Sequence, residues 1–404
     1  MSPYHTQLYL NPQAQPPPTY GPTQQALLDE ETFAAAKTEI TSWPEYAPTP
    51  LIDLPQRAAA SGMGQLHCKH EGFRFGLGSF KPTGPTYAML LVLKGEIAKA
   101  AGKETIATQD LVDGTYRDLT SRITVGAVTS GNHGRALAWG AQLFGCRAVI
   151  YMSDGVSPGR ERAIAAYGAE IIRVPGPYDR AVRQANKDAA EQGYFLVSDQ
   201  PHPDYPQVPS AILQGYALVA DEIADQLPKP PTHVFAPGGG GILSGAVCGQ
   251  LWRRYGDQRP KLIVVEPTNS CCLYASARAG RAVAVDTGTS LMDGLVVEQA
   301  SVEPWQILGA GADAFLTIPD QAASDAMTQA ANPLAGDPPL VIGDTGSAAW
   351  AGFLATSKDP DLRQRLDLNS DSRIVLVTTE GATDPEVYQA VIGQSPEEVL
   401  TASP

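Results

Sequence analysis

The apolar residues in the middle of this 404-residue chain alternate between two patterns. Short, continuous apolar runs, typical of buried strands, are followed by segments in which apolar side chains recur with the period of a helix. The runs predict strands at 123–129, 147–152, 170–174 and 194–199. The segments between them predict helices at 132–144, at 158–167 and at 178–192; Ser157 and Pro158 mark the start of the second and Gly168 its end.

The same alternation returns after residue 231. It predicts strands at 232–238, 261–267 and 373–379, with a helix at 242–255. Strands that alternate with helices of this length form right-handed βαβ units and a parallel sheet. The sequence therefore predicts two α/β blocks, whose ligands should lie at the carboxyl ends of the strands. Residues 1–24 are polar and rich in proline, which indicates an irregular N-terminal arm.

Composition narrows the classes of partner. The formal net charge of −14 disfavours nucleic acid and anionic membranes. No apolar run reaches the roughly 18 residues that a membrane span needs, and the N-terminus lacks the pattern of a signal peptide. The five cysteines are scattered, with no Cys-x-x-Cys pair and no metal-ligand spacing. They are typical of reduced thiols in a cytoplasmic protein, and no metal site is predicted.

Lys81 stands in a setting that is unusual for a surface lysine. It lies in FGLGSFKPTG, residues 75–84, among aromatic and small residues and directly before an apolar helix. Burial favours the neutral amine of a lysine, and a neutral amine can form a Schiff base with an aldehyde cofactor. The alternative is a lysine at a helix start whose amine lies in water.

A second motif, VTSGNHG at 128–134, joins a predicted strand to a predicted helix. Ser130, Gly131 and Asn132 lie where the first helical N–H groups point outward. This position suits an anion such as an amino-acid carboxylate. The alternative is plain helix capping by Ser130 or Asn132, and His133 alone is typical of a structural histidine.

A third motif, PGGGGILSG at 237–245, has the same strand-to-helix position. Four glycines allow main-chain N–H groups to surround a phosphate without obstruction by side chains. The competing interpretation is a nicotinamide dinucleotide loop, but the required glycines at i, i+2 and i+5 are not found here. Glu266, at the end of the next predicted strand, occupies the place of a ribose ligand and keeps this alternative open.

A fourth motif, VTTEGATD at 377–384, ends a predicted strand with the hydroxyls of Thr378 and Thr379. A hydroxyl beside a pyridine nitrogen leaves that nitrogen unprotonated, whereas an aspartate would keep it protonated. The alternative is an ordinary threonine-rich turn. The order of the four motifs along the chain is much harder to obtain by chance than any one of them.

Together these motifs resemble the fold type II pyridoxal 5′-phosphate (PLP) enzymes, the tryptophan-synthase-β-like group that includes serine and threonine dehydratases. The likeness extends over roughly residues 40–390 and includes EGFRFGLGSFK, SGNHGRALAWGAQLFGCRAVIYM, PTHVFAPGGGGI and TTEGATDPE. Within the group, the chain looks most like the diaminopropionate ammonia-lyases. The resemblance implies an α/β fold of two doubly wound parallel-sheet domains, with the cofactor in the cleft between them. Residues 25–85 and 232–404 would form the large PLP-binding domain and residues 86–231 the small one.

The resemblance also implies which residues bind the cofactor. Lys81 would hold it covalently, Asn132 would contact its ring hydroxyl and Thr379 its pyridine nitrogen. The phosphate would lie on the four glycines of the third motif, Gly238, Gly239, Gly240 and Gly241.

The residues implied for the substrate include one departure from the family. Asp199, in LVSDQ, matches an acid or base of the ammonia-lyases, and Ser130, Gly131 and His133 would lie beside the substrate. The ammonia-lyases usually have an aspartate at the position of Ser130, which is implicated in use of the D-isomer. A serine there is what the dehydratases carry, and it removes both a base and a counter-charge for a second ammonium group.

The resulting prediction is a cytoplasmic, homodimeric PLP lyase. It would carry out α,β-elimination on a small amino acid such as 2,3-diaminopropionate and give a 2-oxo acid and ammonia. The alternatives are a dehydratase of serine, threonine or hydroxyaspartate and a β-replacement synthase, which share these motifs. A nicotinamide-dependent dehydrogenase and a non-catalytic PLP-binding protein are the alternatives from other classes.

Overall fold

The computed structural model describes residues 4–14, 19–129, 131–198 and 207–401. The chain forms two compact units, each assembled from segments that are distant in the sequence. Unit 1 consists of Met1–Asp29, Ala47–Phe80 and Tyr216–Pro404, and unit 2 of Glu30–Tyr46 and Lys81–Gly215. The chain therefore passes from unit 1 to unit 2 twice: it first enters after Asp29 and returns after Tyr46. It enters again between Phe80 and Lys81 and returns within a helix, α10 (Gln207–Gln226).

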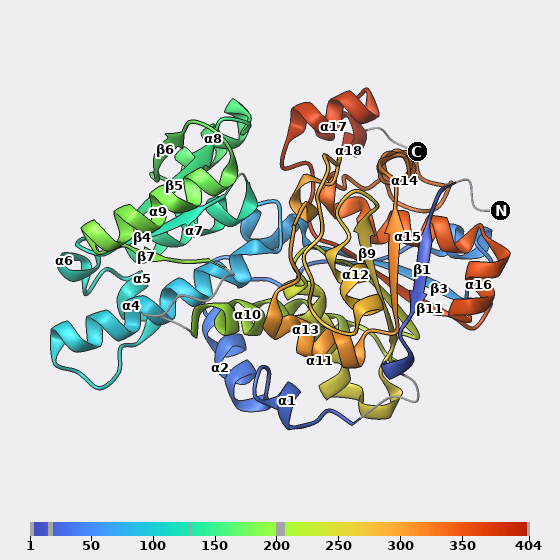
Figure 1. The fold of residues 1–404 in the computed structure, drawn as a ribbon, viewed down its shortest axis with the longest axis horizontal. Coiled ribbons are helices and arrows are strands. Elements are labelled where there is room, and N and C mark those ends of the chain that lie inside the picture. Colours follow the sequence, from blue (N-terminus) through green and yellow to red (C-terminus); the bar gives the residue numbers. More distant parts are fainter. Residues whose placement is uncertain (1–3, 15–18, 130, 199–206, 402–404) are drawn as a thin grey trace. The chain divides into compact units, whose positions relative to one another are not determined.

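Unit 1 contains a seven-stranded sheet in the order β1-β10-β9-β8-β11-β3-β2. The five inner strands are parallel to one another, and the two outer strands are antiparallel to their neighbours. In sheet order the strands are β1 (Gln7–Leu10), β10 (Ala314–Ile318), β9 (Lys261–Pro267), β8 (His233–Pro237), β11 (Arg373–Thr378), β3 (Gln65–His70) and β2 (Leu51–Asp53). In Figure 1 the strands of this sheet have different colours, because they come from distant parts of the chain.

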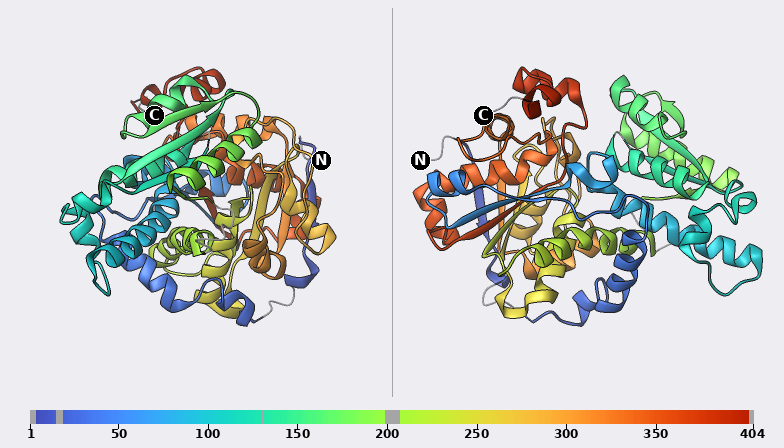
Figure 2. Two further views of the ribbon diagram at one scale, coloured as in Figure 1. Left: turned by 60° about the vertical axis from the view of Figure 1, so that its left-hand side comes forward. Right: turned by 180° about the vertical axis from the view of Figure 1, so that it is seen from behind.

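Helices cover this sheet, which explains why the inner strands β8, β9, β10 and β11 are largely apolar and buried, whereas β3 also carries polar residues. One helix, α15 (Ala348–Ser357), is buried over its whole length and contacts β8, β9, β10 and β11. The other helices of unit 1, which Figure 2 shows from two further sides, are η1 (Pro12–Ala14), α1 (Pro22–Gln25), α3 (Pro55–Ala60), η2 (Glu71–Gly76), α11 (Ile242–Tyr255), η4 (Gly256–Gln258), α12 (Cys272–Ala279), η5 (Asp293–Leu295), α13 (Val302–Gly311), α14 (Asp320–Ala331), η6 (Thr345–Ser347), α16 (Pro360–Leu366), α17 (Pro385–Ile392) and α18 (Pro396–Thr401).

Unit 2 contains a four-stranded sheet in the order β6-β5-β4-β7, in which all neighbours are parallel. Its strands are β6 (Glu170–Val174), β5 (Arg147–Ser153), β4 (Thr124–Val128) and β7 (Phe195–Leu196). Its helices are α2 (Glu30–Thr41), η3 (Lys81–Thr83), α4 (Pro85–Ala101), α5 (Thr108–Val112), α6 (Arg117–Thr120), α7 (Asn132–Phe144), α8 (Pro158–Ala165) and α9 (Tyr178–Gln192). Gly140 brings α7 close to α4, since a Cβ atom there would lie 2.4 Å from the Met89 Cε atom.

The α/β fold with two mainly parallel sheets is confirmed, and three predicted helices have the predicted bounds: α7, α9 and α11. The N-terminal arm is not irregular throughout, because Gln7–Leu10 forms β1 on the edge of the larger sheet. The pattern missed this strand because its four residues are only half-buried or exposed, so main-chain pairing rather than burial defines it. The strand predicted at 194–199 is shortened to Phe195–Leu196.

The two units also have other bounds than the predicted domains. Residues 30–46 belong to unit 2, where Trp43 packs against Trp139 and Phe144 of α7. Within the described ranges, no helix is long and apolar enough to cross a membrane. All five cysteines are free thiols.

Candidate active site

The segment that leads to Lys81 is a tight turn held against the end of β11. Phe75, Gly76 and Gly78 have φ angles of 49°, 66° and 78°, and the two glycines adopt them without steric strain. The Phe80 amide donates to the Thr379 carbonyl at 3.0 Å, and the Gly381 amide donates to the Gly78 carbonyl at 3.0 Å. Because Lys81 is the next residue, its main chain begins where this anchored segment ends.

The start of the same turn is fixed by a buried cluster of charged residues that the sequence analysis did not identify. Arg74 donates to Glu71 (Nε–Oε2, 2.9 Å) and to Glu222 (Nη1–Oε1, 2.6 Å), and the Lys69 Nζ atom lies 2.6 Å from a Glu222 oxygen. None of these side chains is more than 5% exposed. Burial alone would lower the pKa of Arg74, but the two carboxylates outweigh it and raise that pKa. The signal in the sequence was three charged residues, Lys69, Glu71 and Arg74, within an otherwise apolar stretch.

The glycine loop, Gly238–Gly241, connects β8 to α11 in unit 1. Its carbonyl groups are occupied: those of Gly238, Gly239 and Gly240 accept from the Gly241 amide, the Cys272 thiol and the Ser301 amide. Gly239 and Gly241 have φ angles of 61° and 97°, which a side chain would strain.

The amides of the glycine loop are the groups left for a ligand. In the part of the chain that the structure describes, the amides of Gly239, Gly240 and Ile242 donate to no protein acceptor. Ile242 is the first residue of α11, so its N–H group belongs to the positive end of that helix. The loop thus offers main-chain donors to an anion.

Glu266 lies behind the glycine loop and is fully buried. Its two carboxylate oxygens accept from the amides of Leu273 (2.9 Å) and Tyr274 (2.7 Å) in the first turn of α12. Because the side chain is fully buried and each oxygen accepts from a protein amide, the carboxyl is not presented to a ribose as the nicotinamide alternative required. Burial raises the pKa of Glu266 to about 8, although the two amide bonds act in the opposite direction.

The two threonines at the end of β11 have different partners. The Thr378 hydroxyl accepts from the Cys68 thiol of β3 at 3.2 Å, so it is used within the sheet. The Thr379 hydroxyl is buried and, among the described residues, has no hydrogen-bond partner. A buried hydroxyl without a partner costs free energy, of the order of 1–3 kcal/mol, unless a ligand satisfies it. Of the two, Thr379 is therefore the residue available to a ligand.

The SGN loop, residues 129–133, connects β4 to α7 in unit 2. Gly131, Asn132 and His133 are half-buried, the Gly131 amide donates to the Thr129 hydroxyl at 3.1 Å, and His133 Nε2 lies 2.8 Å from the Val197 carbonyl. That bond ties His133 to the segment after β7 and supports a structural role for its ring. Ser130 and Asp199 lie outside the described residues.

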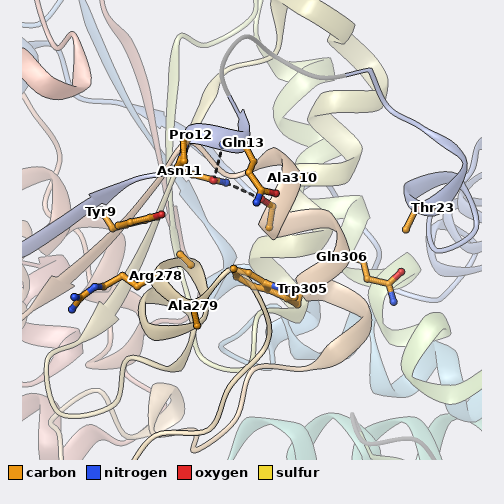
Figure 3. Close-up of a pocket in the computed structure, with 13 residues that line it drawn as sticks. Tyr9, Asn11, Pro12, Gln13, Thr23, Arg278, Ala279, Trp305, Gln306 and Ala310 are labelled. Atoms are coloured by element: carbon orange, nitrogen blue, oxygen red, sulfur yellow. Dashed lines mark hydrogen bonds between the residues drawn. The ribbon is translucent and has the colours of Figure 1, made fainter.

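A surface pocket of about 460 Å³ in unit 1 involves none of the predicted site residues. Figure 3 shows Tyr9 and Asn11 on one side and Trp305 and Arg278 on the other, with the Asn11 amide hydrogen-bonded to the Gly309 carbonyl. The pocket lies between the N-terminal segment and the helices α12 and α13. It is a separate feature from the glycine loop and from Thr379.

Comparison with known proteins agrees with this geometry. The model of a family described as pyridoxal-phosphate dependent enzyme matches residues 43–380. The diaminopropionate ammonia-lyase of Escherichia coli K12 is 34% identical over 355 residues, which cover 86% of this chain and 87% of that protein. A solved structure of the E. coli enzyme in complex with D-serine is 30% identical, covers 98% of this chain and 99% of that chain, and has a TM-score of 0.87. The same enzyme with an aminoacrylate-PLP azomethine reaction intermediate covers 97% of each chain, with 30% identity and a TM-score of 0.84.

The described residues fit the cofactor that this family uses. A phosphate needs several N–H donors at close range, and the glycine loop together with the first residue of α11 has three amides without an acceptor among the described residues. A pyridine nitrogen needs a hydroxyl, and the Thr379 hydroxyl is buried without a partner among the described residues. An aldehyde needs an amine, and Lys81 directly follows the residue whose amide is bonded to the Thr379 carbonyl.

Proposed function

Because this chain belongs to the pyridoxal-phosphate dependent enzymes, we propose that it eliminates the β-substituent of a small amino acid, with 2,3-diaminopropionate as the first candidate. Its similarity to diaminopropionate ammonia-lyases over nearly the whole chain makes it a PLP-dependent lyase. The products of the proposed reaction are a 2-oxo acid and ammonia.

The single observation that carries the proposal is the position of Thr379. Its carbonyl accepts from the amide of Phe80, next to Lys81, and its buried hydroxyl has no partner in the described part of the chain. A threonine rather than an aspartate at the pyridine nitrogen leaves the ring unprotonated, which makes it a weaker electron sink. This suits an elimination, because that reaction does not require a long-lived carbanion. This supports assignment of Thr379 to the ring nitrogen and Lys81 to the aldehyde.

The remaining cofactor contacts follow from the two loops. The glycine loop, Gly238–Gly241, would hold the phosphate through the amides of Gly239 and Gly240 together with that of Ile242, and Asn132 would contact the ring hydroxyl. When bound, PLP supplies an electron sink that acidifies the α-hydrogen of an amino acid. The Nζ atom of Lys81 would be the base that removes that proton from Cα, because a neutral lysine amine can accept a proton.

The substrate contacts are proposed from the sequence and the relatives. The N-terminus of α7, with Ser130, Gly131 and His133 near it, binds the substrate carboxylate. Asp199 gives a proton to the leaving amine, so that ammonia rather than an amide ion departs. A second candidate function, dehydration of a β-hydroxy amino acid, is favoured by Ser130, which stands where the ammonia-lyases usually have an aspartate.

A substrate panel tests the proposal. The purified holoenzyme is incubated with D- and L-2,3-diaminopropionate, serine, threonine and hydroxyaspartate, and both 2-oxo acid and ammonia are measured. We expect diaminopropionate to be the fastest substrate. Ser130→Asp should raise the kcat/KM ratio of the D- to the L-isomer at least about tenfold, because it restores a carboxylate base; general bases contribute about 10²–10⁴-fold.

The other outcomes of the panel separate the alternatives. Fastest turnover of a hydroxy amino acid would assign the chain to the dehydratases. Formation of product only after a thiol or an amine is added would indicate a β-replacement synthase. No reaction with any of these amino acids would overturn the proposed lyase activity on this substrate class.

We also propose that the protein is a cytoplasmic homodimer, as the resemblance implies. Free thiols at all five cysteines agree with a reducing compartment. Light scattering coupled to size-exclusion chromatography tests the oligomeric state: a mass near 42.7 kDa would contradict the dimer.

A further inference from the structure

Glu266 is in direct contact with the glycine loop. A Cβ atom placed on Gly238 would lie 2.4 Å from the Glu266 Cγ atom and 3.2 Å from its carboxyl carbon. The Gly238 amide donates to the carbonyl of Val265, the residue before Glu266, at 2.8 Å. The loop therefore lies against this side chain with no intervening layer.

The same carboxyl also holds the helix on the other side of the loop. It accepts from the Leu273 and Tyr274 amides, and the preceding residue of that helix, Cys272, donates its thiol to the Gly239 carbonyl at 3.4 Å. Glu266 thus connects strand β9, helix α12 and the glycine loop. A change at this carboxyl is transmitted to the main chain of Gly238 and Gly239.

Among the described residues, no cation is paired with this buried carboxyl. Burial raises the pKa of Glu266, and the hydrogen bonds from the two amides act against this rise. The titratable groups that face it are the thiols of Cys271 and Cys272, whose pKa values are raised by burial and further by Glu266. On the neighbouring strand β10 its partner in register is Thr317, which accepts from the Gln7 amide and does not titrate. A second negative charge at the loop would therefore act on Glu266 without a screening partner.

We propose that Glu266 is a positioning residue for the cofactor phosphate and that it binds a proton when the phosphate occupies the glycine loop. The proposal rests on the proposed function, in which that loop holds the phosphate. Glu266 does not touch the cofactor; it sets the geometry of the loop through α12 and removes a negative charge from behind it.

The proposal implies a pH dependence of cofactor affinity. The phosphate is a dianion at neutral pH, and like charges in a poorly screened region repel. The uncharged form of Glu266 is therefore favoured in the complex. In the protein without PLP, the pKa of Glu266 is raised to about 8, so above that pH the binding of PLP is coupled to the uptake of a proton by Glu266. PLP affinity should fall as pH rises from about 8 to 9.5, and the affinity for pyridoxal, which has no phosphate, should lack this component.

Equilibrium titration of the apoprotein with PLP and with pyridoxal, from pH 7 to pH 9.5, tests the proposal. Bound PLP is followed by its absorbance and by its phosphorus-31 resonance, neither of which requires turnover. For Glu266→Gln we expect at least about a tenfold loss of PLP affinity at pH 7, since an amide nitrogen cannot accept from the helix amide. Its pyridoxal affinity should change less than PLP affinity, and its PLP affinity should show a flatter pH dependence than the wild type.

Two controls isolate the effect. Glu386→Gln removes the same charge from an exposed position on α17 and should bind PLP as the wild type does. Glu266→Asp keeps a carboxylate on a shorter side chain, so it should weaken PLP binding and retain the pH dependence. If Glu266→Gln fails to fold, Glu266→Asp still tests the proposal. The proposal is overturned if the PLP affinity of this variant changes with pH in the same way as its affinity for pyridoxal.

A loop variant distinguishes failure of this proposal from failure of the site. Gly240 is half-buried and its φ is not positive, and a Cβ atom there would lie 3.1 Å from the Ser301 hydroxyl, which must shift slightly. Gly240→Asp should repel the phosphate, and Gly240→Asn, which is neutral and of equal size, controls for the steric effect. If Gly240→Asp loses PLP affinity while Glu266→Gln has the affinity and pH profile of the wild type, the role of Glu266 is wrong and the phosphate site is retained. If Gly240→Asp also binds PLP as the wild type does, the phosphate lies elsewhere and both proposals are wrong.

Discussion

The glycine loop of unit 1 and the SGN loop of unit 2 occupy the same topological position but are built differently. Each connects a parallel strand to a helix at the carboxyl end of its sheet. The glycine loop is buried except at Gly240; the Gly238 carbonyl accepts from the Gly241 amide within the loop, and those of Gly239 and Gly240 accept from Cys272 and Ser301 elsewhere in unit 1. The described residues of the SGN loop are half-buried and carry side chains, Asn132 and His133.

The comparison indicates which kind of ligand suits a site made of main-chain groups and which suits a site made of side chains. A loop with bonded carbonyl groups and positive φ angles presents its amides in a fixed arrangement, which suits the invariant phosphate of a cofactor. A half-buried loop with side chains suits contact with a substrate, which is the role proposed for Ser130. We therefore expect changes in the glycine loop to act on cofactor affinity and stability, and changes in the SGN loop, apart from those at Asn132, to act on KM.

The largest effect is expected at Lys81, which is proposed to hold the cofactor covalently. Lys81→Ala should remove the long-wavelength absorption of the bound cofactor and lower kcat at least about 10²–10⁴-fold, the range that general acid–base catalysis contributes. Absorbance spectra and single-turnover assays measure both. Lys99→Ala, on the exposed face of α4, is the matched control. A Lys81→Ala enzyme that keeps its visible band and its turnover would contradict the assignment of Lys81.

A pair of glycine variants compares the two loops directly. Gly241 has a φ angle of 97°, and a Cβ atom there would lie 3.1 Å from methyl groups of Leu273 and Leu308, whereas at Gly131 nothing lies within 4 Å. Gly241→Ala should cost about 1–3 kcal/mol of unfolding free energy, while Gly131→Ala should stay within about 1 kcal/mol of the wild type. Urea denaturation of the apoproteins measures the difference. Equal losses would show that the two loops do not differ in rigidity.

Substitution of the two threonines is expected to have a smaller effect. It distinguishes a hydroxyl that stabilises the fold from one that binds a ligand. Thr379→Val should leave the apoprotein as stable as the wild type, because its buried hydroxyl lacks a partner among the described residues. It should weaken PLP binding by up to about tenfold, the value of one hydrogen bond. Thr378→Val should lose about 0.5–1.5 kcal/mol of stability with its bond to Cys68 and bind PLP normally. The reverse assignment would hold if Thr378→Val were the variant with weakened PLP binding.

The sequence predicted most of the elements because their signals are local. The apolar runs of β5 and β9 and the periodic faces of α7, α9 and α11 can be recognised without knowledge of any distant partner. The edge strand β1 could not be predicted in this way. It exists because Gln7–Leu10 pairs with Ala314–Ile318, about 300 residues away, and its side chains carry no pattern of burial.

The sequence by itself determined the α/β class, the family and the four motifs, because each depends on residue types at short spacing. Only the tertiary structure decided which groups in those motifs are left for a ligand. It bonds the Thr378 hydroxyl to Cys68 and leaves that of Thr379 buried without a partner among the described residues. It turns both oxygens of Glu266 to the amides of α12, and it joins Arg74 to Glu222 across 148 positions. The physical reason is that hydrogen bonds and desolvation depend on which distant side chains meet, and a linear sequence does not specify those contacts.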